Sequence, residues 1–343
     1  MSAGPERVER AIRERRDEVN EAIVEALPIK RPERLYEASR YLLDAGGKRL
    51  RPTVLLLTAE AITDTDPLAG DYRAFGPEAI DVLTAAVSVE VIQSFTLIHD
   101  DIMDDDDVRR GVPAVHREYD LETAILAGDT LYSKAFELML DTGAPADRSV
   151  RALDQLATTC TKICEGQALD VEFEGRDAVT PAEYLEMVES KTAVLYAAAA
   201  SIPAVLLGAD DEVVQALNGY GLDVGRAFQI QDDLLDLTVP SDVLGKQRGS
   251  DLIEGKRTIV TLHAKRQGVD VDDLVSTDTH MEVSEADIDR AVGELEDAGS
   301  IEYAREMAHE YIETGKDRLQ VLPDNEARHT LEGIADYLVE REY

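Results

Sequence analysis

The sequence predicts one all-α domain, residues 1–343, in which long helices pack around a central cavity. Three observations predict this fold class. Apolar residues recur at helical spacing through most of the chain. No alternating strand pattern and no Asn-Gly or Asp-Gly hairpin turn stands out. No repeat, linker or low-complexity segment divides the chain, and it contains neither a G-x-G-x-x-G motif nor a P-loop.

Each expected helix is marked by an apolar stripe or by a boundary residue. Gly46-Gly47 ends the second helix, and Pro52 favours the first turn of the third. Segment 77–101 is apolar on most faces, which predicts a central buried helix. Shorter helices follow Arg257. The marking residues and expected ranges are Val8, Ile12, Val19 and Ile23; Leu35, Leu42 and Leu43; 52–62; 77–101; 122–140; 149–171; 181–207; 211–237; and 325–340.

The charge balance limits the partners of the chain. Its 35 basic and 71 acidic residues give a formal net charge of −36, and the acids are spread along the whole chain. Such a chain repels nucleic acid and anionic membrane surfaces, and it suits the screened interior of a salt-rich cytosol. The charge-free run 192–209 only just reaches membrane-spanning length, so we interpret it as a buried core helix and not as an integral membrane segment. The charged N-terminus lacks an apolar signal segment, so we expect a cytoplasmic protein.

Two copies of one acidic pattern, D-D-x-x-D, carry the main chemical signal. The first comprises Asp100, Asp101 and Asp104, and the second comprises Asp232, Asp233 and Asp236. Residues four apart share one face of a helix, so each motif gathers carboxylates in an apolar setting, where they must be paired or hold a metal. Mg²⁺ is usually held by one or two carboxylates plus substrate phosphates. The pattern therefore suggests a diphosphate bound through Mg²⁺.

Basic residues surround these motifs in the sequence, although the chain is poor in them. Each position has an alternative interpretation, as a helix cap with solvated cations, as local charge balance, or as a surface lysine. Arginine forks match phosphate oxygens, and loops after such motifs can close over phosphates. The candidate anion-binding residues are Lys48, Arg49 and Arg51; Arg109 and Arg110; Lys191; and Lys246, Lys256 and Arg257.

These motifs together resemble those of the trans-prenyl diphosphate synthases, also called polyprenyl synthetases. The resemblance rests on GGKRLRP at 46–52, DDIMD followed by RRG, GDxL at 128–131, KTA at 191–193 and FQIQDDLLD at 228–236. The acidity adds a similarity to salt-adapted archaeal members. The resemblance implies antiparallel helices around a deep hydrophobic pocket, the isoprenoid synthase type I fold, usually as a homodimer. It implies small-molecule substrates, isopentenyl diphosphate and the allylic dimethylallyl, geranyl and farnesyl diphosphates.

The resemblance also implies a role for individual residues. The two aspartate motifs would together hold about three Mg²⁺ on the allylic diphosphate. Thr192 and Gln229 look placed to stabilise a carbocation, and with Arg109, Lys191 and the motif aspartates Asp100, Asp101, Asp104 and Asp232 they form the implied catalytic set. The implied ligands are Arg109, Lys191, Thr192, Gln229, Lys246 and Lys256 for the allylic diphosphate, and Lys48, Arg51, Gln93 and Arg110 for isopentenyl diphosphate.

The expected product is geranylgeranyl diphosphate. Phe95 lies five residues before Asp100 and is followed by the small Thr96, and no insertion widens the DDIMD motif. In this family a bulky residue at that position acts as a pocket floor; the alternative is that Phe95 is an ordinary core residue. Farnesyl diphosphate or a mixture of short chains is the other enzymatic outcome. A regulatory subunit of a heteromeric synthase is the non-enzyme alternative, although both aspartate motifs are intact here.

Overall fold

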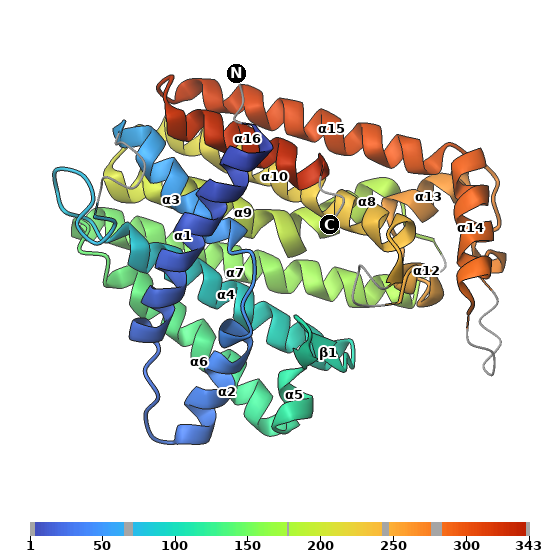
Figure 1. Ribbon diagram of the computed structural model, residues 1–343, viewed down its shortest axis with the longest axis horizontal. Coiled ribbons are helices and arrows are strands. Elements are labelled where there is room, and N and C mark those ends of the chain that lie inside the picture. Colours follow the sequence, from blue (N-terminus) through green and yellow to red (C-terminus); the bar gives the residue numbers. More distant parts are fainter. Residues whose placement is uncertain (1–3, 65–70, 177, 242–246, 276–282, 341–343) are drawn as a thin grey trace. The chain divides into compact units, whose positions relative to one another are not determined.

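The computed structural model describes residues 4–64, 71–176, 178–241, 247–275 and 283–340, and it confirms the predicted all-α fold (Figure 1). Lys246, a predicted allylic-diphosphate ligand, lies outside these residues. The first helices are α1 (Pro5–Ala26), α2 (Glu33–Asp44), α3 (Leu50–Thr63), α4 (Val82–Met103), α5 (Val115–Glu118), α6 (Leu121–Leu140) and α7 (Ala146–Glu174). The later helices are α8 (Pro181–Val188), α9 (Val194–Leu207), α10 (Asp211–Thr238), α12 (Ser250–Ile253), α13 (Ile259–Arg266), α14 (Glu285–Asp297), α15 (Ser300–Arg318) and α16 (Glu326–Glu340).

The chain divides into two compact units, which we treat separately. Unit 1 comprises Met1–Cys160, Leu195–Gly221 and Arg318–Ile334, and unit 2 comprises Thr161–Val194, Leu222–Asp317 and Ala335–Tyr343. Every boundary between them falls inside a helix, for example inside α7 and α10. The single domain therefore stays a prediction.

Helix α4 is the centre of unit 1, where it packs against α1, α3 and α6. Its apolar faces are buried on most sides, as its composition predicts. The predicted start at residue 77 is wrong: Phe75 and Ile80 pair as an isolated β-bridge, and the helix begins only at Val82. Asp81 caps it, since its carboxylate accepts the backbone N–H of Thr84 at 2.8 Å. The end of α4 carries the first aspartate motif.

A short hairpin follows α4, although the sequence predicted no strand. Strands β1 (Val108–Arg109) and β2 (Val112–Pro113) pair antiparallel. The two turn residues, Arg110 and Gly111, both have positive φ, of 53° and 76°. Such a backbone joins the two strands of a tight hairpin, because its twist matches theirs. Two-residue strands are too short to show an alternating pattern, which explains the missed prediction.

The predicted continuous helix 181–207 contains an irregular segment, which lies in unit 2. Helix α8 passes into a π-helical segment, Glu189–Ala193, before α9 begins at Val194. The segment includes Lys191 and Thr192, two of the predicted ligands. π-Helical turns inserted into α-helices occur frequently at functional sites.

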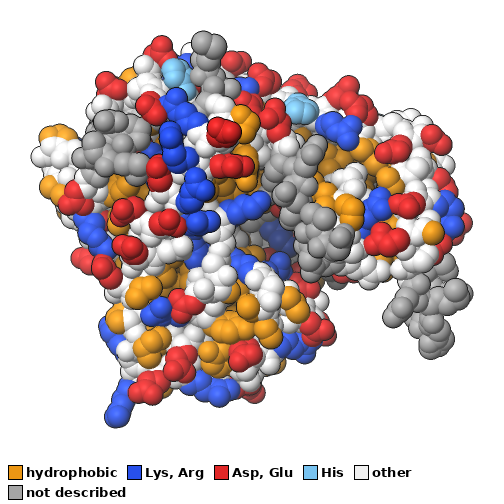
Figure 2. All heavy atoms as spheres, in the orientation of Figure 1, with side chains coloured by type: hydrophobic (Ala, Val, Ile, Leu, Met, Phe, Trp, Pro, Cys, Tyr) orange, Lys and Arg blue, Asp and Glu red, His pale blue; other side chains and the backbone are white. Residues whose placement is uncertain are grey.

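Among the residues that the structure describes, two helical segments are long and apolar enough to cross a membrane, Val82–Met103 and Pro181–Leu207. Most of each segment is buried, 67% and 78% of the tested windows, as in core helices of globular proteins. Figure 2 shows acidic and basic side chains interspersed over the visible face.

Candidate functional site

The GGKRLRP loop of unit 1 is shaped by its glycines. Gly46 and Gly47 have φ of 96° and 146°, which side chains disfavour. A Cβ on Gly47 would lie only 3.1 to 3.3 Å from the guanidinium atoms of Arg110. The missing side chain therefore lets the hairpin arginine lie directly against the loop. The structure thus places Arg110 against this loop, and the predicted ligand role of Lys48, Arg51 and Arg110 stays a prediction.

The three cationic side chains of this loop, Lys48, Arg49 and Arg51, have different surroundings. Lys48 is exposed, and the Arg51 guanidinium lies over the Tyr196 ring, 4.2 Å from its centroid. Arg49, which has a positive φ of 52°, is only 3% exposed. Its guanidinium donates to Glu90 Oε1 at 2.5 Å and to the Leu43 carbonyl at 2.6 Å. Arg49 is thus a buried side chain that links α4 to α2, and not a surface cation.

Glu90 is a residue that the sequence analysis missed. Its carboxylate is 3% exposed and accepts from both Arg49 and Arg110, the latter at 3.3 Å. It lies on α4 three residues before Gln93, so the two side chains share a helix face. The available signal was a lone carboxylate in the long uncharged stretch of α4 that precedes His99, because such a group must find a partner.

The first aspartate motif ends α4. Asp101 is fully buried, and its Oδ1 accepts from Arg109 Nε at 2.6 Å. Burial raises the pKa of Asp101 to about 6, even though Arg109 opposes the shift. Asp100 is half-buried and Asp104 is exposed, and the two are one helical turn apart, with the Asp104 N–H donating to the Asp100 carbonyl. At the C-terminal end of α4, the three carboxylates of the motif therefore range from buried, at Asp101, to exposed, at Asp104.

The residues of this motif fit a hard divalent cation. Asp101 Oδ2 is buried and has no hydrogen-bond partner in the described part of the chain. Carboxylate oxygen is the donor that Mg²⁺ prefers, and such ions keep phosphate or water in the remaining positions. No three histidine, cysteine, aspartate or glutamate side chains converge on one position among the residues described. A metal held by this motif stays a prediction, which the buried Oδ2 of Asp101 fits.

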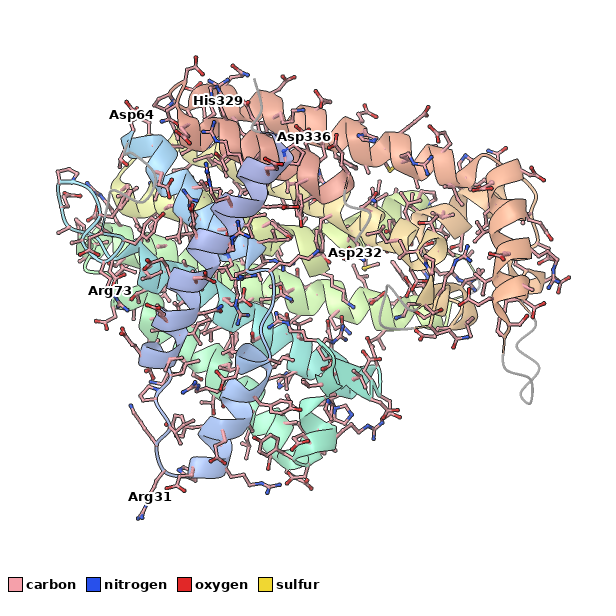
Figure 3. All side chains as sticks on the ribbon, in the orientation of Figure 1. Arg31, Asp64, Arg73, Asp232, His329 and Asp336 are labelled. Atoms are coloured by element: carbon pink, nitrogen blue, oxygen red, sulfur yellow. The ribbon has the colours of Figure 1, made fainter. Side chains whose placement is uncertain are left out.

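The second aspartate motif lies on α10 in unit 2, where Figure 3 labels Asp232. Asp233 is buried; its Oδ2 accepts from the Tyr184 hydroxyl, and its Oδ1 accepts from Gln229 Nε2 at 3.1 Å. Burial raises the pKa of Asp233 well above its usual value. Asp236, 1% exposed, accepts from the Ser250 hydroxyl at 2.8 Å. Protein donors therefore hold the carboxylates of Asp233 and Asp236.

Lys191 is set by the π-helical segment. Its Nζ lies 2.6 Å from Asp170 Oδ2 on α7. Gly166, one turn earlier on α7, leaves room for the backbone of this segment, since a Cβ there would lie 2.3 Å from the backbone nitrogen of Lys191. Thr192 donates to Gln229 Oε1 at 2.9 Å, which links the segment to the second aspartate motif.

These residues of unit 2 line one cavity of about 120 Å³. Lys256 joins them from the loop after α12, where its Nζ lies 3.0 Å from Glu254. The structure thus brings together most of the predicted allylic-site residues of this unit. The cavity is lined by Asp170, Tyr184, Met187, Val188, Lys191, Thr192, Gln229, Asp233, Asp251, Lys256, Arg257 and Thr258.

Phe95 lies in an aromatic cluster between α4 and α6. Its ring centroid is 4.9 Å from that of His99 and 5.2 Å from that of Tyr132. Gly128, the glycine of the GDxL motif, admits the His99 ring, because a Cβ there would lie 2.2 Å from His99 Nε2. Thr96 donates to the Gln93 carbonyl at 2.8 Å. The Phe95 ring therefore packs against His99 and Tyr132 one to two helical turns before the first aspartate motif, and its role as a pocket floor stays a prediction.

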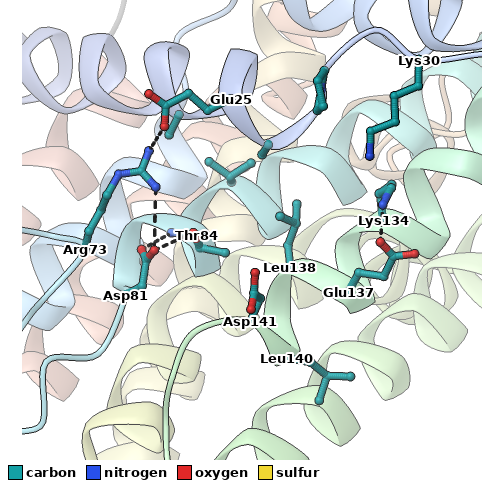
Figure 4. Close-up of a pocket in the computed structure, with 14 residues that line it drawn as sticks. Glu25, Lys30, Arg73, Asp81, Thr84, Lys134, Glu137, Leu138, Leu140 and Asp141 are labelled. Carbon is teal, nitrogen blue, oxygen red and sulfur yellow. Dashed lines mark hydrogen bonds and ion pairs between the residues drawn. The ribbon is translucent and has the colours of Figure 1, made fainter.

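A larger pocket of about 690 Å³ lies elsewhere in unit 1 and contains none of the predicted site residues (Figure 4). Its four carboxylates, those of Glu25, Asp81, Glu137 and Asp141, outnumber its three cations, Lys30, Arg73 and Lys134. Arg73 lies 2.5 Å from Glu25 and 3.8 Å from Asp81, and Lys134 pairs with Glu137. This arrangement does not favour an anionic ligand.

The helical fold, the two aspartate motifs and the basic residues near them are typical of an enzyme that binds diphosphates. A family model described as Polyprenyl synthetase matches residues 32–295, so the chain belongs to the polyprenyl synthetase family. The chain is 74% identical over 339 residues to the geranylfarnesyl diphosphate synthase of Natronomonas pharaonis, and the match covers 98% of both. It is thus a prenyl diphosphate synthase of the short-chain type, which acts on small-molecule diphosphates.

Solved structures agree with this assignment. The geranylgeranyl pyrophosphate synthetase of the archaeon Geoglobus acetivorans superposes with a TM-score of 0.85 and 46% identity, covering 96% of this chain and 99% of that one. A polyprenyl synthase from Caulobacter crescentus, solved with calcium and isoprenyl diphosphate, has a TM-score of 0.84 and 31% identity, covering 100% and 99%.

Proposed function

We propose that this enzyme condenses isopentenyl diphosphate head to tail with allylic diphosphates, makes geranylgeranyl diphosphate, and ends at geranylfarnesyl diphosphate when isopentenyl diphosphate is in excess. The 74% identity to a geranylfarnesyl diphosphate synthase is the observation that supports the longer end product. Geranylgeranyl diphosphate as the end product is the second candidate. The buried Phe95 ring favours it, because a bulky floor shortens the available pocket.

The allylic diphosphate must lose its C–O bond, and cationic side chains favour this step. Lys191 and Lys256 line the same cavity, where each would donate to diphosphate oxygens as negative charge develops. We assign the same role to Arg109 and Lys246. When bound by Asp100, Asp101, Asp104, Asp232, Asp233 and Asp236, about three Mg²⁺ would supply the larger share of this charge stabilisation.

The allylic cation needs stabilisation without a nucleophile. Thr192 and Gln229 are hydrogen-bonded to each other, which fixes their dipoles beside the diphosphate cavity. We propose that their oxygens face the cation. An apolar pocket around the prenyl chain would exclude water, which would otherwise capture the cation.

Isopentenyl diphosphate would be held by Lys48, Arg51, Gln93 and Arg110, which lie on the glycine loop, α3, α4 and the hairpin. Its double bond attacks the cation, so a new C–C bond forms. The condensed carbocation then loses a proton, and the diphosphate released from the allylic substrate takes it. Neither step needs a nucleophilic side chain.

The test is a condensation assay. The protein is incubated with labelled isopentenyl diphosphate, Mg²⁺ and farnesyl diphosphate in concentrated KCl, with and without excess EDTA. We expect label in longer prenyl diphosphates and its loss with EDTA. No incorporation at any salt concentration would contradict the proposed activity and favour a regulatory subunit of a heteromeric synthase.

The setting of the enzyme is also proposed. We infer a cytoplasmic homodimer adapted to high salt, and the net charge of −36 supports the adaptation because a salt-rich cytosol screens such a charge. Size-exclusion chromatography with light scattering in concentrated KCl would test the dimer.

A further inference from the structure

Glu90 occupies an unusual position for a carboxylate. It is the one acidic or basic residue of α4 before His99, and only 3% of it is exposed. A buried carboxylate is tolerated only when it is paired and hydrogen-bonded. Its Oε1 accepts from two arginines at once, from Arg49 at 2.5 Å and from Arg110 at 3.3 Å.

The two arginines differ in what they leave accessible. The Arg49 side chain is 1% exposed, and its Nε, Nη1 and Nη2 donate to Asn20, Glu90 and the Leu43 carbonyl. Each nitrogen of the Arg49 guanidinium therefore donates to a protein acceptor, on α1, α4 and α2. The Arg110 side chain is 19% exposed, so part of its fork can still reach a ligand.

Arg110 depends on Glu90 for its position. Its other described anchor is the Leu42 carbonyl, which accepts from Nη1 at 3.1 Å. Burial lowers the pKa of Arg110, and the nearby charges of Arg49 and Arg51 lower it further. Glu90 is the acceptor that opposes this repulsion. Without the Glu90 carboxylate, the four cations Lys48, Arg49, Arg51 and Arg110 would lose one buried negative charge that balances them.

We propose that Glu90 is a positioning residue for the isopentenyl diphosphate site, an inference that rests on the proposed function. It fixes Arg110 directly, and it fixes the glycine loop through Arg49, so that Lys48, Arg51 and Arg110 meet the diphosphate in one geometry. Glu90 itself does not touch the substrate. The loss of Glu90 therefore weakens the binding of isopentenyl diphosphate and leaves the allylic substrate unaffected.

The test is Glu90→Gln, which keeps the shape and removes the charge. Isothermal titration of the Mg²⁺-loaded protein with isopentenyl diphosphate alone reports binding without turnover. We expect Kd and KM for isopentenyl diphosphate to rise about tenfold or more, with kcat and the KM for farnesyl diphosphate within about threefold. An unchanged Kd would overturn the proposal.

Glu60→Gln is the matched control. Glu60 is 1% exposed, lies on α3 of the same unit, and accepts from the buried Arg15 at 2.9 and 2.6 Å. We expect its loss to lower Tm as much as Glu90→Gln does, with no change in isopentenyl diphosphate binding. Equal weakening by both variants would reduce Glu90 to a general stabilising role and overturn the proposal.

Two further outcomes stay distinguishable. If Glu90→Gln does not fold, Glu90→Asp keeps the charge but shortens the side chain by one methylene, and the same rise in Kd is required of it. If the wild-type protein neither binds nor incorporates isopentenyl diphosphate, the proposed function fails, whatever Glu90 does.

Discussion

At the scale of single residues, the carboxylates of the second aspartate motif differ in what holds them. Asp233 accepts from Tyr184 and Gln229, and Asp236 accepts from Ser250. Asp232 is only half-buried. A carboxylate already held by protein donors contributes to the stability of the fold as well as to any ligand.

Substitution of these residues should therefore separate catalysis from stability. Asp232→Ala is expected to lower kcat by at least about 10²-fold with little change in Tm, because it removes a charge proposed to hold metal. Asp236→Ala should also destabilise the fold by about 1–3 kcal/mol, because it leaves the Ser250 hydroxyl and the Asp251 N–H without their acceptor. Thermal unfolding and steady-state assays in concentrated KCl measure both. A near-wild-type rate for Asp232→Ala would refute the proposed metal site.

Phe95 provides a test of product length. Phe95→Ala removes the ring that packs between His99 and Tyr132, so we expect products longer than those of the wild type. Such a truncation costs about 3–5 kcal/mol of stability, so Phe75→Ala, at a buried position of the same unit, is the control. The control should keep the wild-type product length. Chromatography of the dephosphorylated products that shows the same chain lengths for Phe95→Ala would exclude a floor at this position.

At the scale of elements, the π-helical segment between α8 and α9 is held by close backbone contact. A Cβ on Gly166 would lie 2.3 Å and 2.7 Å from the N and Cα of Lys191. Backbone atoms cannot turn aside as a flexible side chain can. Helix α7 and the segment therefore depend on this glycine for the Lys191–Asp170 ion pair.

Gly166→Ala should displace Lys191. We expect a loss of about 1–3 kcal/mol in the free energy of unfolding from overpacking, and a rise in KM for the allylic diphosphate. Gly293→Ala in α14 of the same unit is the control, because a Cβ there would meet nothing within 4 Å and alanine favours helices. Unchanged kinetics in Gly166→Ala would show that the close contact does not position Lys191.

The sequence predicted the elements with strong local signals and missed those set by distant contacts. The helix ranges near 122–140 and 211–237 were confirmed within a few residues, because their apolar periodicity is continuous. The predicted start of α4 was wrong because the apolar composition of 77–101 does not reveal the Phe75–Ile80 bridge, which delays the helix. The π-helical segment has no composition of its own, since its register depends on Gly166 far away in the chain.

The candidate site was predicted to a similar extent. The aspartate motifs and their basic neighbours could be named because charge in an apolar context is a local signal. The partners of these residues could not, since Tyr184 and Asp170 acquire their roles only when separate helices meet. Sequence spacing alone does not predict such meetings.

At the scale of the whole molecule, net charge should control the range of salt in which the enzyme is stable. A net charge of −36 produces self-repulsion that salt screens. We expect activity and Tm to fall together as KCl is diluted, and circular dichroism with an activity assay at each concentration measures both. Full and lasting activity in dilute buffer would contradict the salt adaptation.

The chain length of the product tests the central claim most directly. Labelled isopentenyl diphosphate is supplied in excess with geranylgeranyl diphosphate as the primer, and the dephosphorylated products are sized. The proposal predicts a dominant twenty-five-carbon alcohol. Failure to extend this primer, while farnesyl diphosphate is extended to twenty carbons, would contradict it and leave geranylgeranyl diphosphate as the end product.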